Sequence, residues 1–153
     1  MSVPDAISPS HAAFVARLAG LVRQGGAVLD VACGTGTYWS ALLAAGLHVT
    51  GVDASAEMLA QTLQDLAKLP DRFDALLCVD ALECVAPEDW PVVASGLAAM
   101  LKDQAPAYVT VELPCYPPRD QVRGWLADAG FALTDEADAD RYWHLLLART
   151  TDR

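Results

Sequence analysis

Residues 27–38 read AVLDVACGTGTY, and this stretch decides the fold. It begins as an apolar strand, reaches an acid at Asp30 and then turns through Gly34 and Gly36. Because glycine has no side chain, such a turn lets the backbone pass close to a nucleotide-like ligand. Open α/β sheets bind ligands at the carboxyl ends of their strands, and Asp30 adds a carboxylate there. The stretch therefore predicts a cofactor site.

The composition fits one globular domain over residues 1–153, with 54% hydrophobic and 20% charged residues. A net charge of −10, from 20 acids and 10 bases, argues against nucleic acid or an anionic membrane surface as a partner. The four cysteines form no CxxC pair, and no group of residues has metal-ligand spacing. With no signal peptide or membrane-spanning run in the sequence, we expect a reduced, cytoplasmic protein.

Apolar periodicity predicts helices that alternate with strands along the whole chain. The expected helices cover residues 9–23, the stretch from the glycine turn to residue 45, and residues 55–68, 91–102 and 119–129. The expected strands cover residues 27–31, 48–52, 73–79, 107–113, 131–134 and 142–148. Ser8 or Ser10 is the expected cap of the first helix, and Ser55 that of the helix over 55–68. The acidic DEADAD stretch, residues 135–140, is expected to be a solvated loop between two antiparallel strands.

Four motifs in this order resemble those of class I S-adenosylmethionine-dependent methyltransferases of the small-molecule type. VLDVACGTG (28–36) is similar to the first motif of that family, and GVDAS (51–55) to the motif of its second strand. DLAKLPDRFDALLCVDALECV (65–85) resembles the stretch that holds the adenine contact and the fourth strand. WLADAGF (125–131) resembles the turn before the terminal hairpin. The resemblance implies an α/β Rossmann-like sandwich with a mostly parallel sheet and a C-terminal antiparallel β-hairpin.

The resemblance also implies a site for S-adenosyl-L-methionine. Asp30 would hold the amino end of the cofactor, directly or through water, and the glycine turn would border its methionine part. Asp53 would accept both ribose hydroxyls, since an ionised carboxylate takes two hydrogen bonds in parallel. Asp65 would meet the adenine, and Asp80 would lie at the methyl end. The residues implied are Asp30, Ala32, Cys33, Gly34, Gly36, Asp53, Ala54, Asp65, Leu66, Asp80 and Ala81.

Each of three carboxylates also has a purely structural interpretation. Asp30 also fits a cap of the glycine turn, and Asp53 followed by Ser55 also fits a helix start. Asp65 lies on a predicted helix, where a solvated face explains it as well as an adenine contact does.

The spacing between Asp53 and Phe73 departs from the family pattern. A helix of ~11 residues, a strand of ~5 and three short connections need about 25 residues, whereas 19 separate these two positions. The third strand, at the edge of the family's sheet, should therefore be shortened or missing. One wall of the adenine pocket would then be thin or rebuilt from residues 64–70.

Methyl transfer from a sulfonium is an in-line displacement, to which a protein contributes mainly by aligning the reactants. A general base is needed only where the acceptor arrives protonated. Candidates for this base near the strand ends are Glu83, His11 and Tyr116. Glu83 also fits an exposed loop acid, and Tyr116 also fits a packing residue of its proline-rich turn. Tyr38 and Trp39 fit either the floor of a substrate pocket or the core.

Three functions are compatible with these residues. The first is a methyltransferase that acts on a small molecule. The second is a non-catalytic domain that binds S-adenosylmethionine or S-adenosylhomocysteine and regulates or completes a partner. The third, a nicotinamide-dependent oxidoreductase, is disfavoured because the third glycine of GxGxxG would fall on Trp39. No inserted lid domain is recognisable, so the helix over residues 9–23 and the loops after the strands over 73–79 and 107–113 must cover the site. Both an open pocket and a homodimer whose second subunit acts as a lid are compatible with this.

Overall fold

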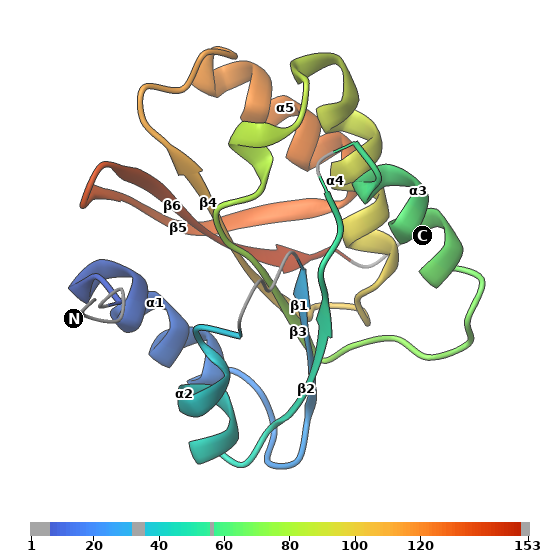
Figure 1. The fold of residues 1–153 in the computed structure, drawn as a ribbon, viewed down its shortest axis with the longest axis vertical. Coiled ribbons are helices and arrows are strands. Elements are labelled where there is room, and N and C mark those ends of the chain that lie inside the picture. Colours follow the sequence, from blue (N-terminus) through green and yellow to red (C-terminus); the bar gives the residue numbers. More distant parts are fainter. Residues whose placement is uncertain (1–6, 32–35, 56, 151–153) are drawn as a thin grey trace, which may run out of the picture.

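A twisted mixed β-sheet runs through the centre of the computed structural model, which describes residues 7–31, 36–55 and 57–150 (Figure 1). Its strands in the described residues are β1 (Ala27–Val31), β2 (His48–Val52), β3 (Ala75–Cys78), β4 (Pro106–Glu112), β5 (Phe131–Ala139) and β6 (Tyr142–Arg149). They lie in the order β2-β1-β3-β4-β6-β5. The first four strands of this order are parallel, and β6 is antiparallel to both β4 and β5. The predicted fold is thereby confirmed.

Helices cover both faces of the sheet (Figure 1). One face carries α1 (Pro9–Gly20) and α2 (Trp39–Ala44), and the other carries α3 (Leu59–Leu66), α4 (Trp90–Ala99) and α5 (Arg119–Ala129). Two short 3₁₀-helices, η1 (Leu82–Cys84) and η2 (Pro87–Asp89), connect β3 to α4. Successive residues of β3 point to opposite faces, so Leu76 packs into the core under α3–α5 and Leu77 into the core under α1. This double burial explains the uniformly apolar sequence of β3.

The ends of two helices follow their predicted signals. Ser8 caps α1, where its hydroxyl accepts a hydrogen bond from the backbone N–H of His11, and Pro9 occupies the first turn. Helix α5 stops at Gly130, whose φ of 102° lies in the left-handed region that favours glycine.

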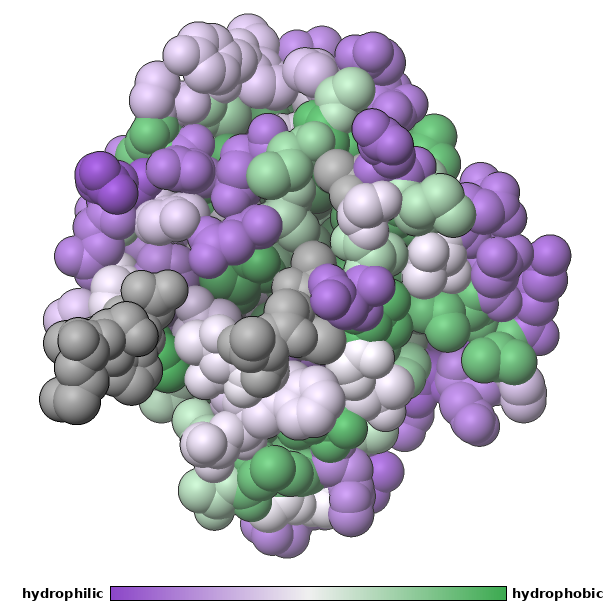
Figure 2. Space-filling model, viewed as in Figure 1, coloured by the Kyte–Doolittle hydropathy of each residue, from purple (hydrophilic) through white to green (hydrophobic). Residues whose placement is uncertain are grey.

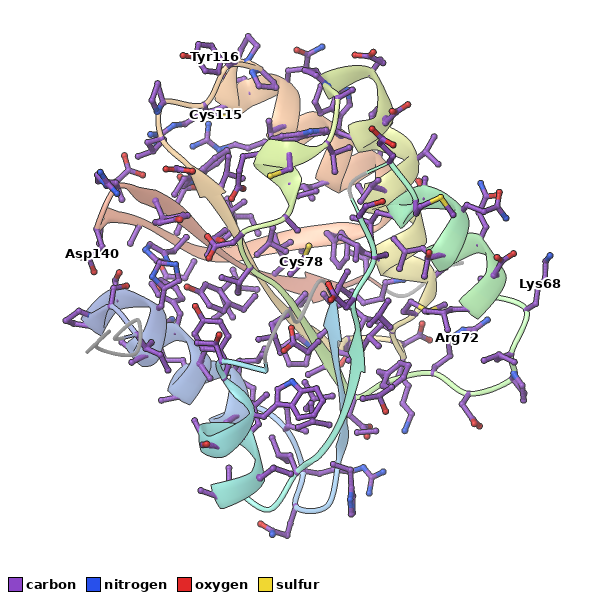
Figure 3. All side chains as sticks on the ribbon, in the orientation of Figure 1. Lys68, Arg72, Cys78, Cys115, Tyr116 and Asp140 are labelled. Atoms are coloured by element: carbon purple, nitrogen blue, oxygen red, sulfur yellow. The ribbon has the colours of Figure 1, made fainter. Side chains whose placement is uncertain are left out.

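The family's third strand is missing from the described residues. Between β2 and β3, residues 53–55 and 57–74 contain helix α3 and turns but no strand, so β2 forms the edge of the sheet. Arg72 stabilises the connection after α3, because its guanidinium donates hydrogen bonds to the carbonyl oxygens of Ala67, Leu69 and Asp71. Figure 3 shows Arg72 and Lys68 along this connection. The predicted shortening or loss of the third strand is confirmed for the described residues.

The predicted start of the helix over residues 55–68 was wrong. Helix α3 begins at Leu59, with Met58 at its N-cap position and no hydrogen bond from a capping side chain. Ser55 instead closes a turn through its carbonyl oxygen, which accepts from the N–H of Met58 at 3.0 Å. Leu59 and Leu63 are buried as expected, whereas Met58 is 54% exposed.

The acidic stretch at residues 135–140 is not a loop, which corrects a second expectation. Strand β5 continues through Ala139, and the turn consists of Asp140 and Arg141, whose φ values of 54° and 69° are both positive. Three of the acids pair with bases of α1 and α5, in the pairs Asp135–Arg17, Glu136–Arg123 and Asp138–Arg119. Their polarity therefore marks an exposed edge strand. Figure 2 shows hydrophilic residues gathered over this end of the hairpin.

Candidate functional site

The candidate site lies at the carboxyl ends of β1, β2 and β3. From β1 the chain crosses to β2 on one side, while β3 lies on the other side, so the strand order reverses between β1 and β3. Such a switch point is where open α/β sheets bind ligands. Val31 at the end of β1 pairs with Val52 of β2 and with Cys78 of β3. The pairing brings Asp30, Asp53 and Asp80 to the same end of the sheet.

Asp30 is buried, with 3% of its surface exposed. The indole Nε1–H of Trp39, at the start of α2, donates a hydrogen bond of 2.9 Å to its Oδ2. Burial raises the pKa of Asp30 from 3.8 to about 6, although the hydrogen bond from Trp39 acts in the opposite direction. Asp30 is thus a buried carboxyl group whose pKa lies above its ordinary value, and Trp39 orients it.

The glycine turn is described only from Gly36 onward, so Ala32, Cys33 and Gly34 lie outside the described residues. Gly36 has a φ of 79°, and a Cβ atom there would lie 3.0 Å from Cδ2 of Trp39. Its backbone conformation therefore favours glycine, and the indole beside it leaves little room for a side chain. Trp39 is half-buried and lies at this site rather than in either hydrophobic core, whereas Tyr38 packs against the core under α1.

Asp53 is exposed directly after β2, and it has no hydrogen-bond or ion-pair partner among the described residues. Ala54 is half-buried and packs against the core under α3. An exposed carboxylate without a partner is available to a ligand, which suits the ribose role implied by the resemblance.

Asp65 is exposed on α3 and has partners on its own helix. Its Oδ1 accepts from Nε2 of Gln61 at 3.0 Å and lies 3.5 Å from Nζ of Lys68. Leu66 turns the other way and packs against the core. The contacts of Asp65 match those of a solvated helix face, and the adenine role of both residues stays a prediction.

Asp80 follows β3 with a φ of 58°, and its N–H donates to Oγ1 of Thr110 at 3.2 Å. Aspartate is among the residues that adopt this left-handed conformation most readily, as Asp140 also does in the β5–β6 turn. Burial and the carboxylate of Asp80 together raise the pKa of Tyr142 on β6. The neighbouring Ala81 is buried in the core, with 6% exposed.

The structure places His11 in a buried aromatic cluster rather than on an open surface. Only 5% of His11 is exposed, and its ring lies 4.8 Å from that of His144 and 4.7 Å from that of Tyr142. Burial and the neighbouring His144 lower the pKa of His11. His144 itself is buried, and its Nδ1 shares a hydrogen bond of 2.7 Å with Oη of Tyr108. Sequence reasoning missed this cluster, since the four rings come from α1, β4 and β6.

Glu83 and Tyr116 are brought together, since both line a pocket of about 190 Å³ beside the end of β4. Tyr116 is 87% exposed on the loop after β4, at the upper edge of the molecule in Figure 3. Burial, together with the charges of Asp80 and Glu112, raises the pKa of Glu83. The pocket therefore combines a carboxyl group that retains its proton more readily than usual with a surface phenol.

Residues 7–115 match the family model described as "Methyltransferase domain". The chain belongs to the methyltransferase domain family. Glycine N-methyltransferase of Homo sapiens is 39% identical over 89 residues, which cover 56% of this chain and 30% of that protein. The enzyme of Oryctolagus cuniculus is 40% identical over 83 residues, covering 52% and 28%. The methyltransferase domain thus aligns with about a third of the length of these curated relatives.

Solved structures share the fold of this methyltransferase domain. Magnesium protoporphyrin IX methyltransferase from Synechocystis PCC 6803 with bound SAM gives a TM-score of 0.69 at 23% identity, covering 93% of this chain and 77% of the other. A 1,6-didemethyltoxoflavin-N1-methyltransferase from Burkholderia thailandensis gives 0.65 at 18%, covering 99% and 94%. The [4+2]-cyclase SpnF gives 0.66 at 16%, covering 99% and 85%.

These findings confirm the family that the four motifs predicted, and binding of S-adenosylmethionine is typical of that family. In the described part of the methyltransferase domain, no three His, Cys, Asp or Glu residues are grouped so that they could hold a metal ion. None of its described helices has the length and apolar character that crossing a membrane requires.

Proposed function

We propose that this methyltransferase domain binds S-adenosylmethionine and transfers its methyl group to a small-molecule acceptor by in-line displacement. The observation that carries the proposal is the pair of carboxylates Asp30 and Asp53 at the switch point. One is buried and accepts a hydrogen bond from Trp39, and the other is exposed at the end of the adjacent strand. A cationic amino group suits the first, and a pair of ribose hydroxyls suits the second.

The cofactor would lie across the ends of β1, β2 and β3. The glycine turn with Asp30 would border its methionine part, Asp53 and Ala54 its ribose, and Asp80 and Ala81 its methyl end. Asp65 and Leu66 would reach the adenine, with α3 in place of the missing edge strand. Bound in this way the cofactor supplies an electrophilic methyl group, and the protein contributes by holding the acceptor in line with it.

Of the three candidate general bases, Glu83 and Tyr116 are the better placed. Both line a pocket that is open to solvent, whereas His11 is enclosed by other rings. A carboxyl group with a raised pKa is also a stronger base than an ordinary surface acid. An acceptor that arrives protonated would therefore lose its proton to Glu83 or Tyr116.

The second candidate function is a domain that binds the cofactor without catalysis. The missing edge strand favours it, because the adenine side of the site is reduced. The [4+2]-cyclase SpnF shares this fold, so the fold alone does not imply methyl transfer. The distinction between the two functions rests on turnover, not on binding.

Calorimetric titration with S-adenosylmethionine, S-adenosylhomocysteine and NAD tests the cofactor. Binding of both sulfur ligands and not of NAD supports the proposal, and binding of NAD alone overturns it. Turnover is then assayed over small amines, phenols and carboxylic acids, with glycine included because of the named relatives. Methylated product supports catalysis, and cofactor binding without any product favours the second candidate.

The adenine side has its own test. Asp65→Asn distinguishes the two interpretations of that residue, because it removes the charge but keeps the shape. A loss of cofactor affinity supports the adenine contact, whereas unchanged affinity assigns Asp65 to the solvated face. Size-exclusion chromatography with and without the cofactor shows whether a second subunit covers the site.

A further inference from the structure

A pocket of about 190 Å³ lies beside the end of β4, between the two 3₁₀-helices and the loop that joins β4 to α5. Its walls are mostly proline, valine and aromatic side chains, with Trp90 and Tyr116 among them. Two carboxylates, of Glu83 and Glu112, also line it. Oε2 of Glu83 is buried and has no hydrogen-bond partner among the described residues.

An acceptor oxygen that is buried without a partner is unfavourable unless a ligand supplies a donor. Nothing basic compensates the two carboxylates, since no Lys, Arg or His is among the described residues that line the pocket. Burial, together with the charges of Asp80 and Glu112, raises the pKa of Glu83, although hydrogen bonds from the backbone at Glu83 and Glu112 act in the opposite direction. A cation beside Glu83 would offset this rise. A ligand group that is cationic and donates hydrogen bonds would therefore suit this pocket.

We propose that this pocket binds the protonated amino group of a compact amine, with the ammonium at Glu83 and the apolar body against Trp90 and Tyr116. An ammonium supplies the missing donor in a charge-assisted hydrogen bond. Aromatic faces attract cations as well as apolar carbon, so they suit an amine at both ends. The inference rests on the proposed function where it makes this amine the methyl acceptor.

A metal ion fits the pocket less well than an amine. The described residues provide no group of three metal-ligating side chains here or elsewhere. Hard cations such as Mg²⁺ retain water and require several oxygen ligands, which walls of proline and tryptophan do not offer. A zwitterionic amino acid is also disfavoured, because its carboxylate would lie close to Glu83 and Glu112.

A second hollow of about 360 Å³ adjoins the pocket and shares Pro87, Tyr116 and Pro117 with it. Trp125 of α5 lines this hollow, and Tyr116 lies at the boundary between the two. An acceptor with an aromatic or branched apolar body would extend from the first pocket into the second. This continuity favours an arylalkyl amine over a short one.

Methyl transfer to this amine needs only the amine, the carboxylate of Glu83 and the cofactor. The bound ammonium gives one proton to the carboxylate of Glu83, which frees the nitrogen lone pair. The lone pair attacks the methyl carbon, so that a C–N bond forms while the C–S bond of the cofactor breaks and its electron pair goes to sulfur. The products are a methylated ammonium and S-adenosylhomocysteine, and Glu83 returns its proton to solvent.

Calorimetry with phenethylamine and phenethyl alcohol tests the pocket, since the two probes have nearly the same shape but only the amine is charged. Titrations use the full chain at pH 7.5, first alone and then saturated with S-adenosylhomocysteine. We expect the amine to bind at least tenfold more tightly than the alcohol. Equal affinities, or no binding of the amine in either condition, would overturn the proposal, as would binding of Mg²⁺ that displaces the amine.

Two variants assign the preference to Glu83. Glu83→Gln keeps the shape and removes the charge, so it should abolish the preference for the amine, whereas Asp128→Asn, an exposed carboxylate on α5 outside the pocket, should leave it unchanged. An unchanged preference in Glu83→Gln would contradict the proposal. Glu112→Gln should reduce the preference by a smaller factor.

The affinity for S-adenosylhomocysteine separates this proposal from the proposed function. If wild type and Glu83→Gln both bind it and neither prefers the amine, the pocket proposal alone is wrong. If the amine preference appears and S-adenosylhomocysteine does not bind, the proposed function is wrong and the amine site stands. Equal affinity of both proteins for S-adenosylhomocysteine also shows that Glu83→Gln is folded.

Discussion

The indole Nε1–H of Trp39 donates a 2.9 Å hydrogen bond to Oδ2 of Asp30, and this bond joins the first turn of α2 to the end of β1. The same indole lies where a side chain at Gly36 would extend. Trp39 therefore defines one wall of the candidate cofactor site and the orientation of its buried carboxylate. The sequence position that argues against a dinucleotide thus has a structural role of its own.

The pH dependence of cofactor binding should follow Asp30. Burial raises the pKa of Asp30 to about 6 in the free protein, and a cationic amino group beside it would lower that value again. Binding would then release a proton, so the affinity for S-adenosylmethionine should rise with pH up to about 6 and level off above it. Calorimetry in buffers of different ionisation enthalpy at pH 5.5 measures the proton release. Asp30→Asn should show neither the release nor the rise.

The pH dependence of stability should have the opposite sign. Between 3.8 and about 6 the folded protein binds more protons at Asp30 than the unfolded chain does. Its contribution to the free energy of unfolding therefore falls as the pH rises through that window, by up to about 3 kcal/mol. Urea unfolding of wild type and Asp30→Asn at pH 4.5 and 7 measures the difference. A loss of stability with rising pH that is the same in both proteins would contradict the assignment.

Trp39→Phe should destabilise the protein by about 1–3 kcal/mol, because a buried carboxylate loses its donor. The pKa of Asp30 should rise further, since the hydrogen bond from Trp39 now lowers it. Carbon-13 NMR titration of the Asp30 carboxyl measures this shift directly. Trp125→Phe is the matched control, because Trp125 contacts Trp90 by ring packing alone among the described residues. An unshifted pKa in Trp39→Phe would argue that the indole does not hold Asp30.

Asp74→Asn should lower the free energy of unfolding by about 1–2 kcal/mol. Asp74 accepts from the N–H of Ala27 at 2.8 Å and from Nζ of Lys102 at 2.9 Å, so it joins the starts of β1 and β3 to the connection between α4 and β4. The hydrogen bond from Ala27 is the main reason that the pKa of Asp74 lies below its usual value. Its stabilisation is present above the unfolded pKa and is lost as the pH falls through the folded one. Equal unfolding midpoints of variant and wild type at pH 7 would contradict this role.

Arg141→Gly should stabilise the hairpin by about 1 kcal/mol. Ala139 pairs with Tyr142, so Asp140 and Arg141 form a two-residue turn in which both φ values are positive. Asp-Gly is a favoured sequence for such a turn, since glycine adopts this backbone without a Cβ clash. Thermal unfolding measures the gain in stability. Arg141→Ala is the control, because it removes the same side chain but keeps the Cβ atom. Equal melting temperatures for the two variants would contradict this account of the turn.

The sequence predicted the core of the fold because its signals are local. Strands β1 and β2 match their predicted bounds, and α5 ends at Gly130 as expected. The prediction of a loop at residues 135–140 was wrong because a run of acids is typical of a solvated loop. The bases of α1 and α5 that pair with these acids lie far away in the sequence. The predicted start of α3 was wrong because Ser55, although a good capping residue, forms a turn before the helix through its backbone carbonyl.

The candidate site was predictable only in part, for a similar reason. The positions of Asp30, Asp53 and Asp80 follow from strand order and motif, and the structure brings them to one end of the sheet. The bond between Trp39 and Asp30, the burial of His11 and the pocket at Glu83 depend on contacts between distant elements. No local pattern encodes such contacts.

The proposed cofactor site depends most on Asp53, whose exposed carboxylate would hold the ribose of S-adenosylmethionine. Calorimetric titration of the Asp53→Ala variant with this cofactor is the most direct measurement of that role. Asp103→Asn is the control, because it removes an exposed acid from the connection between α4 and β4, outside the proposed site. We predict at least a tenfold loss of affinity in Asp53→Ala and none in Asp103→Asn. Wild-type affinity in Asp53→Ala would contradict the account.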